Sequence, residues 1–120
     1  MAKILLAEHD KDLRFILDRI LNDAGHYVQS LNEGSSIVNG QVKWPDVFIL
    51  DQQIPTIDGL ALSKYLKINS ETKDIPIIMI SSYPEVRKKA KRIGVNEFLQ
   101  KPFHSDDLLR SIERQVNQRL

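Results

Sequence analysis

The sequence predicts an α/β fold in which a parallel sheet is covered by helices on both faces. Five short apolar runs alternate along the chain with five segments of helical character. Most of the apolar runs are continuous, which is typical of strands buried on both faces. Alternation of strands and helices favours parallel pairing with right-handed crossovers. The strands are expected at residues 3–7, 26–31, 46–51, 75–80 and 96–100.

Helices are expected over residues 12–24, 33–44, 58–68, 84–93 and 105–116. In the first of them, apolar residues recur at i, i+3 and i+4 spacing, Asp10 is the expected N-cap, and Gly25 follows the last apolar position. The second is expected to be short or irregular, because Gly34 and Gly40 each disfavour a helix by about 1 kcal/mol relative to alanine.

Polar residues, prolines and glycines predict further boundaries. Asp58 opens the third helix, and Pro76 is tolerated at the start of the fourth strand. Pro84 fits the first turn of the fourth helix, and Gly94 ends that helix. Trp44 is expected to pack in the core or at its rim.

Length and composition narrow the class of protein. The chain has 120 residues, and we expect a single domain over 1–120. Its net charge of +1 gives no reason to expect nucleic acid or anionic lipid as a partner. The lack of cysteine excludes disulfides, thiolate metal sites and thiol nucleophiles. No signal peptide or membrane span is expected, and we expect a cytoplasmic location.

Polar side chains follow four of the expected strands. Glu8 and His9 follow the first strand, Asp51 ends the third, Ser81 follows the fourth, and Lys101 follows the fifth. Because the carboxyl ends of parallel strands meet at one edge, we expect these side chains to share a cleft. Carboxylates suit Mg²⁺ and can act as nucleophiles, and a lysine can neutralise charge during phosphoryl transfer. The alternative is that each polar residue merely ends a strand.

Four segments resemble the receiver domains of two-component response regulators, and the resemblance covers essentially the whole chain. They are ILLAE at 4–8, LDQQIPTIDG at 50–59, IPIIMISS at 75–82 and FLQKPF at 98–103. The Asp to Pro to Asp-Gly spacing together with Lys-Pro-Phe makes the resemblance highly specific. It implies a flavodoxin-like, doubly wound five-stranded parallel sheet in the order 2-1-3-4-5, with five helices.

The resemblance also implies roles for individual residues. Asp51 falls at the phosphoacceptor position, and Lys101 falls at the lysine that faces the phosphate. Ser81 falls at the hydroxyl that contacts the phosphoryl group, and Phe98 falls at the aromatic switch position. Such a switch works only if phosphorylation biases two pre-existing conformations.

The implied metal site departs from the family pattern at one residue. Glu8, Asp51 and the backbone carbonyl of Gln53 fall at metal ligands, and Mg²⁺ or Mn²⁺ is the implied cofactor. His9, however, stands where a directly binding carboxylate is expected. Imidazole suits Mn²⁺ or Zn²⁺ better than Mg²⁺. With one negative charge fewer, the site should bind Mg²⁺ more weakly. It should also repel an incoming phosphate less. The sequence leaves open which of the two effects dominates.

Three functions are compared. In the first, a histidine kinase or phosphotransfer protein phosphorylates Asp51. The face between the fourth and fifth helices then contacts an output partner. The resemblance also implies that Gln53 and Tyr83 govern how fast water attacks the phospho-aspartate. The alternative is a receiver-like docking module that is weakly phosphorylated or not phosphorylated at all, because of His9. A phosphatase-like enzyme would need a second acid where Gln53 stands, so we expect no enzyme.

One run of basic residues has no role in these three functions. Five cations fall within residues 87–92. They indicate either a surface for an acidic protein partner or simply a solvated helix face, and we expect no direct binding of nucleic acid. His26 and His104 are expected at the surface.

Overall fold

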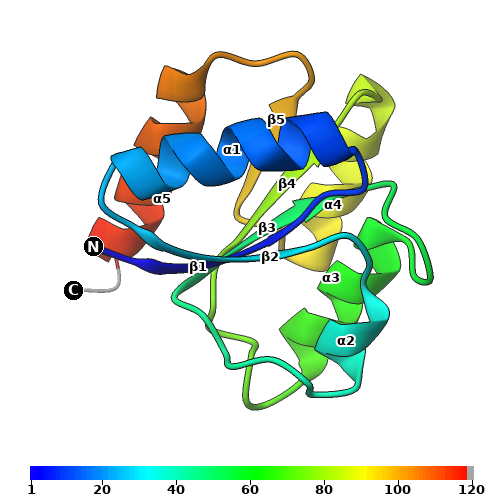
Figure 1. Ribbon diagram of the computed structural model, residues 1–120. Helices are drawn as coiled ribbons and strands as arrows, with labels where there is room; N and C mark the ends of the chain where they lie inside the picture. Colours follow the sequence, from blue (N-terminus) through cyan, green and yellow to red (C-terminus); the bar gives the residue numbers. More distant parts are fainter. Residues whose placement is uncertain (119–120) are drawn as a thin grey trace.

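The computed structural model describes residues 1–118, and residues 119–120, at the end of the predicted domain, lie outside the described residues. In chain order, its elements are β1 (Lys3–Ala7), α1 (Lys11–Asp23), β2 (Tyr27–Leu31), α2 (Ser35–Val38), β3 (Val47–Asp51), α3 (Gly59–Ile68), β4 (Ile77–Ser81), the 3₁₀ turn η1 (Pro84–Val86), α4 (Arg87–Ile93), β5 (Glu97–Gln100) and α5 (Ser105–Gln118) (Figure 1). Over residues 1–118, no helix is both long and apolar enough to cross a bilayer.

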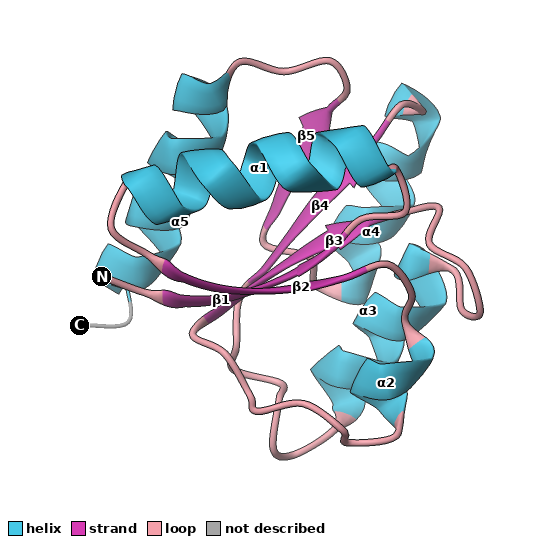
Figure 2. Ribbon diagram, viewed as in Figure 1, coloured by secondary structure: helices cyan, strands magenta, loops and turns pink. Residues whose placement is uncertain are grey.

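The strands form one parallel sheet in the order β2-β1-β3-β4-β5, which confirms the predicted fold and strand order. Helices α1 and α5 cover one face, and α2, α3 and α4 cover the other (Figures 1 and 2). Strands β3 and β4 are buried along their whole length. The residues at their carboxyl ends are therefore held by the best-packed part of the molecule.

The continuous apolar run of β3 serves two cores. Successive side chains of a strand point to opposite faces of the sheet. Phe48 and Leu50 pack under α2, α3 and α4, whereas Val47 and Ile49 pack under α1 and α5. Trp44 lies at the rim of the first core, half-buried, with its ring edge-on to Phe48 at a centroid separation of 6.4 Å. Full burial of each of these four β3 side chains stabilises the fold by about 1.5–3 kcal/mol.

Several predicted boundaries were wrong, and proline and glycine geometry explains two of the differences. Strand β4 begins at Ile77 rather than at 75, because Pro76 has no N–H and takes part only through its carbonyl, which accepts from the Phe48 N–H at 3.0 Å. Strands β2, β3 and β5 each begin one residue later than predicted, and the helix expected over 84–93 is divided into η1 and α4. The helix expected over 33–44 is reduced to α2, and Gly40 follows it with a φ of +70°.

The surface also corrects some predictions. Ile16 and Ile68 belong to the apolar patterns of α1 and α3, yet they are 52% and 75% exposed. His26 is half-buried rather than a surface residue, and its Nδ1 accepts the Ala2 N–H at 3.0 Å. His104 is exposed, as predicted. The predicted N-cap of α1 is confirmed, since the Asp10 side chain accepts the Leu13 N–H at 2.9 Å.

Candidate functional site

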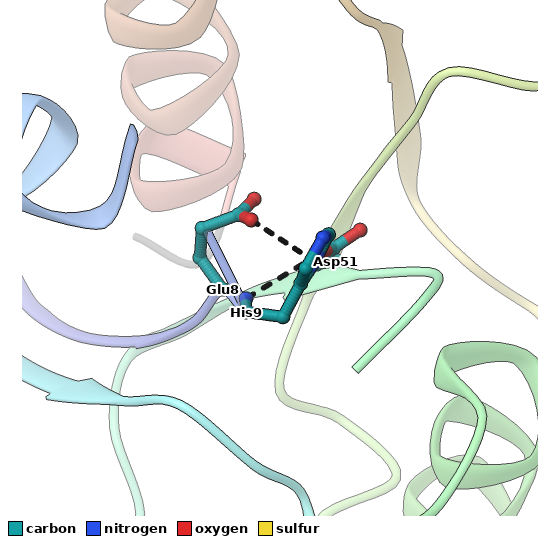
Figure 3. Close-up of side chains that lie close together, drawn as sticks. All are labelled: Glu8, His9 and Asp51. Atoms are coloured by element: carbon teal, nitrogen blue, oxygen red, sulfur yellow. Dashed lines mark hydrogen bonds and ion pairs between the residues drawn. The ribbon is translucent and has the colours of Figure 1, made fainter. Parts of the chain in front are cut away.

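Three strands bring the predicted acids, histidine and lysine to one edge of the sheet. Glu8 and His9 follow β1, Asp51 ends β3, and Lys101 follows β5. Figure 3 shows the side chains of Glu8, His9 and Asp51 directed toward one another. Lys101 reaches both carboxylates from the other side, with its Nζ 2.9 Å from Glu8 and 3.4 Å from Asp51. The expected convergence of these residues is therefore present.

The buried carboxylate of Asp51 has a partner on each oxygen. Its Oδ1 accepts the Gln53 N–H at 3.1 Å and faces Lys101. Its Oδ2 accepts a hydrogen bond from Nδ1 of His9. Burial acts to raise the pKa of Asp51, but the hydrogen bonds from His9 and Gln53 and the charge of Lys101 outweigh burial and leave the pKa lowered. Asp51 is therefore held as the carboxylate, which is the nucleophilic form.

Glu8 is fully buried beside Asp51. Its Oε2 accepts the Asp10 N–H at 2.9 Å and lies 3.3 Å from Nδ1 of His9, while its Oε1 is the atom that Lys101 contacts. Burial raises the pKa of Glu8, because the hydrogen bonds from Asp10 and Lys101 offset only part of the desolvation. The two neighbouring acids are thus shifted in opposite directions, which is common at functional sites.

The donor atoms in this cluster fit a divalent cation. One ligand atom each from Glu8, His9 and Asp51 lie within 4.8 Å of one another. The two carboxylates offer the oxygens that Mg²⁺ prefers, and the imidazole adds a nitrogen that Mn²⁺ accepts more readily than Mg²⁺. His9 and Lys101 already contact the carboxylate oxygens, so a cation would compete with them. The metal-binding role of the Gln53 carbonyl remains a prediction.

The hydroxyl of Ser81, at the end of β4, makes its hydrogen bonds to residues other than Asp51. It donates to Oε1 of Gln52 at 3.2 Å and accepts the Tyr83 N–H at 3.0 Å. The Gln52 amide in turn donates to Oδ1 of Asp58, which is the N-cap of α3, at 3.0 Å. Sequence reasoning missed Gln52. The sequence shows only that Gln52 follows the apolar run that ends at Asp51; its contact with the end of β4 depends on the register of the sheet.

Phe98 of β5 is held from α4. Its ring is partly buried against the core, and the guanidinium of Arg87 lies over it at 4.7 Å from the centroid. Such a cation–π contact contributes about 0.5–1 kcal/mol at an exposed site. The sequence placed Arg87 in the run of five cations but gave no signal that distinguished it from the others. The aromatic ring at the expected switch position is therefore tied to the first residue of α4.

The two residues predicted to tune dephosphorylation, Gln53 and Tyr83, are both exposed to solvent. Gln53 is exposed and, together with His9, lines a groove of about 450 Å³ formed by the loop between β3 and α3. Tyr83 is 44% exposed after the end of β4. Their roles toward a phospho-aspartate at Asp51 remain predictions.

The sequence is similar to those of known proteins. The family model for the response regulator receiver domain matches residues 4–113. The C4-dicarboxylate transport transcriptional regulatory protein DctD of Pseudomonas aeruginosa is 36% identical over 98% of this chain, which spans 26% of that protein. The phosphate regulon transcriptional regulatory protein PhoB of Escherichia coli is 28% identical over 92% of this chain, which spans 50% of it. The chain therefore covers only a quarter to a half of these relatives.

Solved structures show the same fold at full length. A chemotaxis response regulator of Vibrio cholerae superimposes with a TM-score of 0.86 at 30% identity, covering 96% of this chain and 98% of that one. A response regulator described as putative, from Chloroflexus aurantiacus, superimposes with a TM-score of 0.90 at 25% identity, covering 97% and 98%. From its sequence, its fold and the residues at the ends of its strands, this chain belongs to the receiver domain family of two-component response regulators.

Proposed function

We propose that this chain is a phosphoacceptor signalling domain, in which a histidine kinase or phosphotransfer protein phosphorylates Asp51 with the help of a divalent cation. The observation that carries the proposal is the convergence of Asp51 with Glu8, His9 and Lys101 at one sheet edge. A buried carboxylate is ordinarily driven toward its neutral form. Here its contacts keep it ionised, which is the state that can attack phosphorus.

In the proposed reaction, an Asp51 oxygen attacks the phosphorus of a phosphohistidine. The new P–O bond forms as the P–N bond breaks, and the leaving imidazole nitrogen keeps the electron pair and takes up a proton from solvent. Lys101, 3.4 Å from Oδ1, neutralises negative charge that develops on the transferred oxygens. Glu8, His9 and Asp51 are the residues that would hold a cation, which would supply further positive charge.

The response to phosphorylation is proposed to run through Ser81 and Phe98 to the surface between α4 and α5, where an output partner binds. Ser81 would exchange its hydrogen bond to Gln52 for one to the phosphoryl group. Phe98 packs under Arg87 at the start of α4. A change in the position of the Phe98 ring would therefore alter the contact with α4. By resemblance to the family, the exposed side chains of Gln53 and Tyr83 are proposed to control access of water to the phospho-aspartate.

A second candidate function rests on the contact between His9 and Asp51. The imidazole occupies Oδ2 of Asp51, on the side where the predicted metal ligands gather. If a cation cannot displace it, phosphorylation would be slow, and the chain would act as a docking module through protein contacts alone.

The deciding experiment is incubation with a small-molecule phosphodonor in Mg²⁺, in Mn²⁺ or in EDTA, followed by intact-mass measurement. We expect one added phosphoryl group in the presence of at least one of the cations. The addition should be absent in Asp51→Asn and retained in Asp106→Asn, which makes the same change at an exposed residue of α5. No addition with either cation would reject the proposal and favour the docking module.

A further inference from the structure

A groove between α3 and α4 lies apart from the Asp51 site. The two helices are neighbours on one face of the sheet (Figure 1). The groove has a volume of about 520 Å³. Three side chains of α3 and three of α4 line it: Leu60, Lys64, Ile68, Lys89, Arg92 and Ile93.

The groove exposes apolar surface, although Leu60 is also partly packed against the core. Ile68 is 75% exposed, although it ends a helix whose other side is buried. Leu60 lies eight residues earlier in α3, so the two side chains share one side of the helix, about 12 Å apart along its axis. Ile93 of α4 is half-buried across the groove. Together these three side chains make an apolar strip about two helical turns long.

Positive charge is concentrated around this strip. Helix α3 contains two lysines and α4 contains five cations, and neither helix contains an acidic residue. The protein as a whole has a net charge of only +1, so the rest of the chain is acidic in balance. Within the described residues, Lys64, Lys89 and Arg92 have no carboxylate within 4.0 Å. Their charges are available to a partner.

We propose that this groove binds a short amphipathic helix of a partner protein, with an apolar stripe flanked by Asp and Glu. Apolar residues at i, i+3 or i+4, and i+7 of such a helix match a groove of this length. Its acidic flanks would meet Lys64 on one side and Lys89 and Arg92 on the other. This surface differs from the α4–α5 face of the proposed output contact, and binding to it does not depend on phosphorylation of Asp51.

The apolar strip distinguishes this occupant from nucleic acid. Contacts to a nucleic-acid backbone come from cations and polar groups, so they give no role to an isoleucine that is 75% exposed between the cations. A helix with acidic flanks uses both properties of the groove.

The test begins with selection from a displayed library of helical peptides. Leucine is fixed at i, i+4 and i+7, and the flanking positions are drawn from Glu, Lys, Gln and Ser. We expect Glu to be enriched in the binders, whose affinity for the unphosphorylated protein is then measured by fluorescence anisotropy. Higher salt should weaken their binding, because exposed charge pairs are screened.

Matched substitutions locate the binding. Ile68→Ser and Lys89→Glu should each weaken the selected peptides about ten-fold or more, as for residues central to an interface. Ile16→Ser and Lys11→Glu make the same changes at exposed residues of α1, on the opposite face of the sheet, and should leave the affinity within about two-fold. Circular dichroism verifies that all four variants are folded.

Several results would overturn the proposal. They are failure to select any binder, binders without enrichment of Glu, or equal affinity for Ile68→Ser. Tight binding of a random-sequence DNA duplex that resists Ile68→Ser but not Lys89→Glu would identify a nucleic-acid surface instead. Self-association in sedimentation that Ile68→Ser abolishes would identify a second copy of this chain as the occupant.

Discussion

Replacing His9 with aspartate should lower the stability of the protein in the absence of a divalent cation and should enlarge the stabilisation that the cation provides. In EDTA, the new carboxylate would lie near the present position of Nδ1, which is 3.3 Å from Glu8 and in contact with Asp51. A like-charge pair at this distance costs about 4–5 kcal/mol with an effective dielectric constant of about 20. The His9 side chain is 43% exposed, so solvent screening reduces the expected loss to about 1–2 kcal/mol.

This loss can be measured as a shift in Tm. An unfolding entropy of about 2.1 cal/mol/K per residue gives about 0.25 kcal/mol/K for a chain of 120 residues. His9→Asp should therefore unfold about 4–8 °C lower than the natural protein in EDTA. With saturating Mg²⁺, a third oxygen ligand that tightens binding ten-fold adds about 1.4 kcal/mol of stability, or about 5–6 °C, to the cation-induced shift.

The assay is thermal unfolding followed by circular dichroism in EDTA and in saturating MgCl₂. His104→Asp is the control, because it makes the same substitution at an exposed histidine outside the site. Equal stability of His9→Asp and the natural protein in EDTA would refute the electrostatic reasoning. An equal Mg²⁺-induced shift in the two proteins would refute the assignment of His9 to the metal position.

Three further predictions concern the surrounding structure. Gly59→Ala should cost about 1–3 kcal/mol in urea unfolding, because its Cβ would lie 2.5 Å from the Asp51 carbonyl oxygen. At Gly40, which has a φ of +70°, an added Cβ would meet no atom within 4 Å. Gly40→Ala should therefore cost only about 1 kcal/mol, and a larger cost than that of Gly59→Ala would contradict the close-approach argument. Glu33 should titrate in NMR with a midpoint near pH 2, because hydrogen bonds from the serine hydroxyls of α2 lower its pKa from 4.5 to about 2. Its contribution to stability should be complete above about pH 4.5 and lost as the pH falls toward 2, and a midpoint near 4.5 would refute this. Thr72→Val should cost about 1–2 kcal/mol in urea unfolding, since its buried hydroxyl donates to a carbonyl in the last turn of α3 at 2.7 Å; an unchanged unfolding midpoint would exclude this contribution.

The architecture could be predicted because it follows from local patterns. Runs such as Ile4–Ala7 and 47–50 are apolar at every position, and only a strand buried on both faces uses such a run fully. The parallel arrangement then requires Glu8, Asp51 and Lys101 to meet at one edge, since each comes at or just after the end of its strand. Exact boundaries depended on backbone details, such as the proline before β4, that patterns locate only to within a few residues.

The contacts inside the site could not be predicted in the same way. The sequence indicates that His9 lies near Asp51, but the direction of the imidazole depends on packing in three dimensions. The link from Ser81 through Gln52 to Asp58 joins the end of β4, the loop after β3 and the N-cap of α3, and no spacing in the sequence reports these contacts. The exposure of Ile68 was missed because a helical apolar pattern does not say how wide a stripe the core covers.

His9 changes how the negative charge of the two buried carboxylates is compensated. Two buried carboxylates side by side are costly unless positive charge or hydrogen-bond donors compensate them. Lys101 contacts both Glu8 and Asp51, and His9 donates to the oxygen of Asp51 that Lys101 does not face. A third acid in place of His9 would leave the pocket under-compensated until a cation arrived. The histidine therefore lets the pocket form without a cation, but only by occupying an oxygen of Asp51. The folded site and a bound cation both need the same oxygen of Asp51. Substitution of His9 with aspartate should therefore lower the stability without a cation and raise the affinity for the cation.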